Sequence, residues 1–242
     1  MKIKTDILVS FCPDKQNLDE IINWMENEKK LPKESQGNWL AINSAFSKNR
    51  LVTASIENKT IGFFALEKND STATISVAEI HPEYRNKGVA KFFLNQIIDF
   101  LLKHNYYALD LMCAPASSET IWKKLGFANI PESTENKKNK NIILYRIITP
   151  ILETTNKINE GETIEIWNNE PYSTVDDKPT WSWELKFREG TRILIAPIIQ
   201  YVNYKWRIRW KIRDRVIKDC MLQHFDENII DYVIIKNLSE IT

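Results

Sequence analysis

Cysteine is scarce in this sequence and widely spaced. The chain has three cysteines, Cys12, Cys113 and Cys220, and no two of them form a CxxC pair. This number and spacing are unsuited to a disulfide framework or a zinc knuckle, so we expect no bound metal. Isolated cysteines of this kind are typical of proteins that fold in a reducing compartment.

An excess of either charge is also lacking, as is any long apolar run. The 33 lysines and arginines balance 32 aspartates and glutamates, which leaves a net charge of +1 and no general attraction to nucleic acid or membranes. The amino terminus has one apolar run before Pro13, too short for a secretory leader or a membrane span. We therefore predict a cytoplasmic protein with no membrane partner. Hydrophobic residues still make up 43% of the chain, which is enough to bury a core.

Strand and helix patterns alternate over the first 150 residues. Apolar, β-prone runs predict strands at residues 3–11, 51–57, 61–68, 72–80, 106–113, 127–130 and 142–148. Apolar stripes at helical spacing predict one helix that begins near residue 17 and others at residues 39–46, 88–104 and 117–125. The first helix is expected to begin with a capping box made by Asn17 and Glu20. We expect residues 1–150 to form one α/β domain.

The pattern changes after Pro150. Residues 153–162 are typical of a linker, and short alternating or β-branched runs then predict strands at residues 163–167, 181–187, 192–199, 204–212, 216–221 and 229–235. No helix is predicted in this part. We expect residues 151–242 to form a second, antiparallel all-β domain, a sandwich or partly open barrel, whose role the sequence does not indicate.

One segment joins a predicted strand to the long predicted helix: Ile80-His81-Pro82-Glu83-Tyr84-Arg85-Asn86-Lys87-Gly88-Val89-Ala90. At such a junction the first amides of the helix have no partner within the helix, and the helix dipole adds partial positive charge. Gly88 lets the backbone approach a ligand, and Arg85 and Lys87 can add charged contacts. The combination predicts a site for an anion such as a pyrophosphate. The alternative is a surface loop in which Gly88 only starts the helix.

This segment resembles motif A of the GNAT acyltransferase superfamily, in which Arg-x-x-Gly-x-Ala follows a strand and wraps the pyrophosphate of acetyl-CoA. In this chain Arg85, Gly88 and Ala90 carry the pattern. The segment from Trp122 to Phe127 is similar to the end of motif B. The resemblance covers residues 1–150 and implies a GNAT-like mixed sheet flanked by helices.

The resemblance also implies how acyl-CoA would bind. The strand at residues 73–80 would splay from the strand at residues 107–113, and backbone groups of Ala78 and Ile80 would pair with the pantetheine arm. Backbone N–H groups of Arg85, Asn86, Lys87, Gly88, Val89 and Ala90 would hold the pyrophosphate. The implied reaction is direct transfer of an acetyl or other acyl group from acyl-CoA to an amine acceptor. The acceptor stays open, as does the choice between a monomer and a homodimer.

The expected catalytic residues depart from the family pattern. Trp122 stands where the family usually has a tyrosine, proposed as the acid for the leaving thiolate, and an indole N–H cannot act as an acid near neutral pH. Glu79 is the candidate base, and the alternative is a solvated strand residue. His81 fits a turn as well as a titrating role, and Cys113 is expected to be a buried, inert thiol. The rival to an enzyme is therefore a CoA-binding or regulatory module that has lost its acid.

Residues 204–213 alternate strictly between apolar and cationic side chains. The apolar set, which includes Trp206 and Trp210, is expected to face a core. The cationic set consists of Lys205, Arg207, Arg209, Lys211 and Arg213. It could bind nucleic acid or the phosphates of CoA, or it could be paired with acidic neighbours. We favour acidic neighbours, so nucleic acid is a possible partner but not the favoured one.

Overall fold

The computed structural model describes residues 7–27, 36–131, 141–156 and 161–238. The first residues of the strand expected at 3–11, and residues 157–160 of the expected linker, lie outside these ranges. The chain divides into two compact units, one of residues up to 129 together with 141–148, the other mainly of residues from 149 onward. None of the described helices is both long and apolar enough to cross a membrane.

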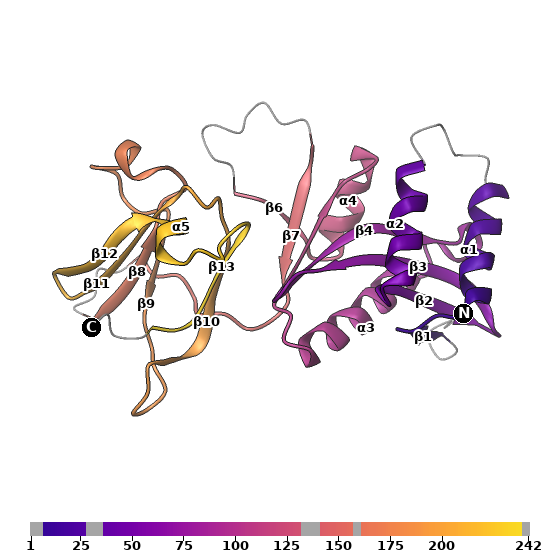
Figure 1. The fold of residues 1–242 in the computed structure, drawn as a ribbon, viewed down its shortest axis with the longest axis horizontal. Coiled ribbons are helices and arrows are strands. Elements are labelled where there is room, and N and C mark those ends of the chain that lie inside the picture. The colour runs from indigo at the N-terminus through magenta and orange to yellow at the C-terminus, as the bar shows by residue number, and fades with distance from the viewer. Residues whose placement is uncertain (1–6, 28–35, 132–140, 157–160, 239–242) are drawn as a thin grey trace. The chain divides into compact units, whose positions relative to one another are not determined.

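A seven-stranded mixed sheet forms the centre of the first unit (Figure 1). Its strands are β1 (Leu8–Ser10), β2 (Leu51–Ile56), β3 (Lys59–Lys68), β4 (Thr72–Ile80), β5 (Ala108–Met112), β6 (Ala128–Asn129) and β7 (Ile143–Ile147). They lie in the order β1-β2-β3-β4-β5-β7-β6. Neighbouring strands are antiparallel except β4 and β5, which are parallel. The strands expected in this part of the chain are confirmed, although β6 has only two residues.

Helices cover both faces of this sheet. On one face, α1 (Lys15–Asn27) and α2 (Gln36–Ser47) pack against a cluster that includes Leu51 and Phe63. On the other face, α3 (Val89–Lys103) and α4 (Glu119–Lys124) pack against the larger cluster, in which Phe93 of α3 is fully buried. The predicted mixed sheet flanked by helices is therefore confirmed.

The start of α1 differs from the expectation. The helix begins at Lys15, and the residues that cap it are Asp14 and Asn17, because each backbone amide donates to the other's side-chain oxygen, at 3.1 and 3.0 Å. Glu20 instead accepts a hydrogen bond from the Thr60 amide at 2.8 Å. The predicted capping box at Asn17 and Glu20 is wrong. Asp14 and Asn17 have the same spacing along the chain as Asn17 and Glu20, so spacing alone does not distinguish the two pairs. The contact with β3 takes Glu20 away from the helix end.

Strand β4 contains one extra residue opposite β3. Ala65 pairs with Val77 and Leu66 pairs with Ile75, so Ser76 is a β-bulge. The parallel pairing of β4 with β5 ends at Ile75 and Leu111, although β4 continues to Ile80. The two strands therefore stop pairing at the bulge, as expected for the strands at residues 73–80 and 107–113.

Two antiparallel sheets form the second unit, one with the order β12-β11-β8-β9 and the other pairing β10 with β13. Their strands are β8 (Glu162–Ile166), β9 (Trp181–Glu184), β10 (Ile193–Tyr201), β11 (Arg207–Ile212), β12 (Arg215–Met221) and β13 (Tyr232–Asn237). Both sheets contribute to one core, which contains Trp183, Ile198 and Ile208. The antiparallel architecture is confirmed. The one-turn helix α5 (Leu222–Phe225) was not expected, since four residues are too few to show a helical period.

Candidate functional site

The loop between β4 and α3 holds most of the predicted site residues. The 3₁₀ turn Pro82–Tyr84 follows β4, and the chain then passes through residues 85–88 before α3 begins at Val89. Two residues of this loop have positive φ angles, Asn86 at 60° and Gly88 at 80°. Glycine and asparagine are the residues that adopt this conformation most readily. The local sequence is therefore suited to the path of the loop.

This path leaves a row of backbone amides at the start of α3. The Arg85 amide donates to the Pro82 carbonyl at 3.2 Å, and the Phe92 amide donates to the Gly88 carbonyl at 3.1 Å. Between them, the amides of residues 86–91 donate to no backbone carbonyl in the described part of the chain. Successive amides at the positive end of a helix dipole form a binding site for an anion.

Space for a ligand is open at Gly88. A Cβ atom placed on this residue would meet no atom within 4 Å. Asn86 and Lys87 are exposed as well, and Lys87 Nζ lies 5.5 Å from the centre of the Tyr84 ring. Val89, by contrast, is 2% exposed and fixes the start of α3 in the core. Of this set, Val89 can therefore contact a ligand only through its backbone.

Arg85 turns back toward the end of β4. Its Nε donates to the Ile80 carbonyl oxygen at 2.7 Å, and its Nη2 lies 3.2 Å from Oε2 of Glu79. The two side chains are 37% and 46% exposed, so the ion pair adds little stability. The hydrogen bond from Arg85 to the Ile80 carbonyl, in contrast, ties the loop to the end of the strand.

The bulge at Ser76 decides which face of the sheet each later residue of β4 lies on. Ala78 and Ile80 pack against the cluster beneath α3. Glu79 pairs with Phe63, which belongs to the cluster beneath α1 and α2. Directly opposed residues of antiparallel strands share a face. The Glu79 side chain therefore lies on the α1–α2 side of the sheet.

His81 has a structural place in the turn. Its Nδ1 accepts a hydrogen bond from the Glu83 amide at 3.4 Å. Its ring lies 4.9 Å from the Trp24 ring and 5.9 Å from the Tyr84 ring, measured between centroids. Trp24 therefore links α1 to the loop that precedes α3.

Trp122 packs into the core of the first unit. Its ring makes edge contacts with Phe64 and Phe127, at centroid distances of 6.2 and 5.3 Å. Cys113 belongs to the same core and is 7% exposed, so the expected burial of this thiol is confirmed. The residue at the usual acid position is thus held by aromatic packing.

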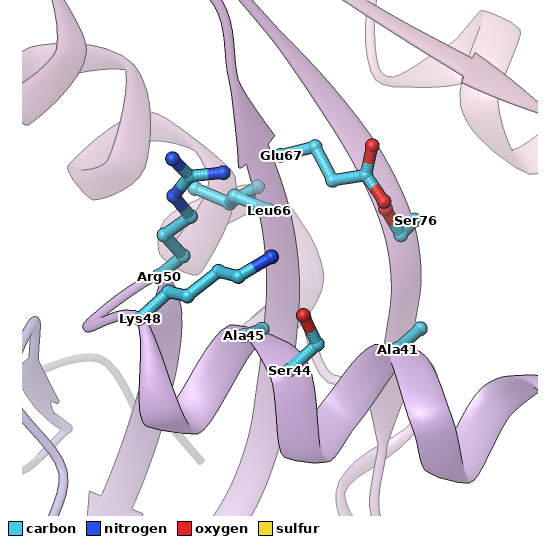
Figure 2. Close-up of a pocket in the computed structure, with 8 residues that line it drawn as sticks. All are labelled: Ala41, Ser44, Ala45, Lys48, Arg50, Leu66, Glu67 and Ser76. Carbon is cyan, nitrogen blue, oxygen red and sulfur yellow. The ribbon is translucent and has the colours of Figure 1, made fainter.

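The first unit also has a pocket that the sequence did not indicate (Figure 2). It has a volume of about 170 Å³ and lies between α2 and the neighbouring strands. Its polar lining consists of Ser44, Lys48, Arg50, Glu67 and Ser76. These residues come from separate elements, so no local motif could have predicted that they meet.

The cations of β11 are paired with acidic residues. Nε and Nη2 of Arg207 donate to the two carboxylate oxygens of Asp219, at 2.8 and 2.7 Å, and Arg207 is only 7% exposed. Arg209 Nε also contacts Asp219, at 2.9 Å, and Lys211 Nζ lies 2.6 Å from Glu165. These pairs agree with the favoured interpretation. They leave little basic surface on β11 for nucleic acid.

Residues 18–127 match the model of the acetyltransferase (GNAT) family. The match begins within α1, includes the loop between β4 and α3, and ends at Phe127, just before β6. A comparison with curated proteins finds no match.

Several solved structures are similar to part of the chain. A GNAT-family acetyltransferase from Staphylococcus aureus Mu50 is 18% identical, with a TM-score of 0.47, over 59% of this chain and 99% of its own. The PaiA N-acetyltransferase from Thermoplasma acidophilum, solved with coenzyme A, is 15% identical, with a TM-score of 0.47, over 59% and 99%. The ribosomal-protein-S18-alanine N-acetyltransferase from Escherichia coli is 17% identical, with a TM-score of 0.45, over 60% and 95%.

Proposed function

We propose that this chain, whose residues 18–127 form a GNAT acetyltransferase domain, transfers an acetyl or other acyl group from acyl-CoA to an amine. The observation that carries the proposal is the row of amides at residues 86–91, which donate to no described backbone carbonyl and lie beside the open space at Gly88. The paired phosphates of a coenzyme offer the oxyanions that such amides bind. Lys87 adds a positive charge at the same loop.

The part of β4 beyond the bulge is the segment that we assign to the pantetheine arm. β4 continues to Ile80 after its pairing with β5 has ended at Ile75. An extended arm can add to such a strand through backbone hydrogen bonds. Ala78 and Ile80 would make these contacts.

The reaction would be a direct aminolysis of a thioester. Bound acyl-CoA supplies the activated acyl group. The amine nitrogen bonds to the thioester carbon, the carbon–sulfur bond breaks, and the proton lost from nitrogen passes to the sulfur or to solvent. A base for that proton and a donor to the oxyanion lower the barrier. No residue of the chain needs to carry the acyl group.

Glu79 is the residue that we assign as the base. Its carboxylate lies on the α1–α2 side of the sheet, and its contact with Arg85 holds it near the loop. The Glu79→Gln variant should lower kcat by about 10²- to 10⁴-fold. It should also remove the rise of kcat with pH, while leaving the affinity for acetyl-CoA unchanged. An unaltered pH–rate profile would exclude Glu79 from this role.

Binding and turnover are tested separately. Titration calorimetry of acetyl-CoA into the purified chain should show saturable binding, and addition of an amine should then release free thiol. A chain that shows no saturation with acetyl-CoA would overturn the proposal. If thiol is released but no amide product forms from the added amine, the assignment of the acceptor as an amine is overturned.

A second candidate function is an inactive CoA-binding or regulatory module. The observation that favours it is Trp122, whose ring is packed against Phe64 and Phe127 and cannot donate a proton to a thiolate near neutral pH. Departure without an acid is chemically feasible, since an ordinary thiol has a pKa of about 8.5. Binding of acetyl-CoA with no thiol release across a panel of amines would favour the inactive module.

A further inference from the structure

The two cationic residues of the pocket beside α2, Lys48 and Arg50, lie where that helix ends. α2 ends at Ser47, Asn49 takes a positive φ of 54°, and the Arg50 amide donates back to the Ala45 carbonyl at 2.7 Å. This left-handed turn closes the helix and directs the chain into β2. Lys48 and Arg50 stand on either side of Asn49, and both line the pocket.

The pocket contains charges of both signs. Lys48 and Arg50 supply two cations, and Glu67 of β3 supplies a carboxylate. No ion pair between these three side chains and any other described residue is found. The negative end of the α2 dipole favours cations at this position. This interaction with the helix dipole does not occupy the N–H groups of Lys48 and Arg50, which therefore stay available to donate to a ligand.

Two polar side chains of α2 and its end are directed into the pocket, and a third lies at its far side. In Figure 2 the Lys48 ammonium and the Ser44 hydroxyl point into the space between α2 and the strands, and the Glu67 carboxyl group lies toward Ser76. Glu67 pairs with Thr74 of β4. The carboxylate is therefore close to the strand that carries the bulge, whereas the two cations lie at the end of α2.

The pocket also adjoins the point where β4 and β5 stop pairing. Ser76, the bulged residue, lines the pocket, and the last parallel pair is Ile75 with Leu111. If the pantetheine arm follows β4 from Ile80 toward the bulge, its thioester end reaches the residues next to Ser76. A molecule in the pocket would then have one end beside the acyl group.

We propose that this pocket binds the acceptor and that the acceptor is a small amino acid. Its carboxylate contacts Lys48 and Arg50, and its amino group, which attacks the thioester as the free amine after losing a proton to the base, lies toward Glu67 and Ser76. This inference rests on the acyl transfer proposed above and adds the class of acceptor. A volume of about 170 Å³ is well below the roughly 300–1,000 Å³ of pockets for drug-sized ligands. The pocket therefore fits one amino acid and excludes large polyamine or sugar acceptors from full burial.

The test compares acceptors that differ only in the carboxylate. Thiol release is measured at saturating acetyl-CoA with a panel of L-amino acids and with the carboxamide of each. We expect kcat/KM for the preferred amino acid to exceed that of its carboxamide by at least about tenfold, because the carboxamide loses contacts with two cations. A carboxamide or a diamine that reacts equally well would overturn the proposal.

Variants locate the effect in the pocket. Arg50→Met and Lys48→Met should each raise KM for the amino acid by about tenfold and bring it closer to that of the carboxamide, with acetyl-CoA affinity unchanged. Lys103→Met is the matched control, since it removes an exposed cation from the last turn of another helix, α3. Equal effects of Lys103→Met and Arg50→Met would overturn the proposal.

Failure of the pocket assignment can be distinguished from failure of the proposed acyl transfer. Thiol release with diamines but not with amino acids would refute the pocket assignment and leave acyl transfer standing. If no amine reacts, saturation-transfer NMR with each L-amino acid of the panel is recorded on protein saturated with coenzyme A. Binding that is lost in Arg50→Met supports the pocket assignment, and absence of binding to the unaltered chain overturns it. Absence of acetyl-CoA binding refutes the acyl transfer itself.

Discussion

At the scale of single residues, Gly88 combines a backbone requirement with an open surface. Its φ of 80° lies where a side chain is strained, yet a Cβ would touch no atom of the protein. Only an approaching ligand would meet that Cβ. Gly190 in the second unit has the same two properties, with a φ of 66°. A comparison of variants at Gly88 and Gly190 therefore separates the effect of backbone strain from an effect on ligand binding.

The Gly88→Ala variant is expected to weaken acetyl-CoA binding by at least tenfold, because the methyl group would enter the space assigned to the pyrophosphate. Both Gly88→Ala and Gly190→Ala should lose about 1–2 kcal/mol of stability through strain. Calorimetry with acetyl-CoA and thermal unfolding measure the two effects. If Gly190→Ala weakens binding as much as Gly88→Ala, the loop before α3 is not the pyrophosphate site.

Asp219 gives a prediction on pH. Burial alone would raise its pKa, but hydrogen bonds from Arg207 and Arg209 outweigh burial and hold the pKa below its ordinary value. A lowered pKa means that the unfolded chain binds the proton more readily than the folded chain. The carboxylate therefore adds stability above its ordinary pKa of about 3.9. That contribution is lost as the pH falls through the lowered pKa.

The Asp219→Asn variant should therefore be less stable than the unaltered chain at pH 7, by about 1–3 kcal/mol, since Arg207 is left buried without its carboxylate. The difference should shrink once the pH falls below about 3.9. Urea unfolding at several pH values measures it. Asp214→Asn, in the exposed turn between β11 and β12, is the control and should have little effect. A loss of stability that does not change with pH would contradict the role of the charge.

At the scale of elements, most helices and strands could be predicted from the sequence because their apolar patterns repeat over many residues. The prediction misplaced the cap of α1 because the choice between Asp14 and Asn17 depends on Glu20, which contacts β3. It missed the bulge at Ser76 because alternation shows only that a strand exists. Helix α5 is shorter than one clear period of the pattern. Errors of this kind lie where tertiary contacts choose between equal local options.

The cap of α1 offers a direct test. Asp14→Ala removes the acceptor of the Asn17 amide and should cost about 1 kcal/mol of stability. Asp19→Ala, on the exposed side of the same helix, removes an equal charge and should cost much less. Thermal unfolding compares the two. Equal losses would show that charge, and not the capping hydrogen bond, stabilises this end of α1.

At the scale of the whole molecule, the chain contains separate cores. The first unit has one cluster on each face of its mixed sheet, and the second unit has its own cluster between two antiparallel sheets. We propose on this basis that residues 1–150 and 151–242 are distinct domains, and that acyl-CoA binding belongs to the first.

Hydrogen exchange can test this division on the intact chain. Saturating acetyl-CoA should slow exchange at the amides of residues 76–91, because they are the proposed contacts of the coenzyme. Residues 162–237 should exchange at unchanged rates. Mass spectrometry of peptides from the labelled chain reports both regions in one experiment. Protection of β10 to β12 by acetyl-CoA would show that the second unit takes part in binding.

The candidate site was predictable only in part, for a reason that acts across the molecule. The loop at residues 85–90 is contiguous in sequence, so its glycine and its position before a helix could be recognised together. The pocket beside α2 depends on sheet pairing that brings Glu67 and Ser76 to the end of a helix. Residues gathered from separate elements in this way have no characteristic spacing in the sequence. The pocket became visible only in the fold.

The single extra residue at position 76 has one more consequence. Before it, the odd-numbered Ala73 and Ile75 are directed to the core under α3; after it, the even-numbered Ala78 and Ile80 are. Loss or gain of one residue here would exchange the faces of the residues that follow in β4, so that Glu79 would face the cluster beneath α3 and Ile80 would face the α1–α2 side of the sheet. A change of length here should therefore disturb the sheet more than the replacement of one side chain.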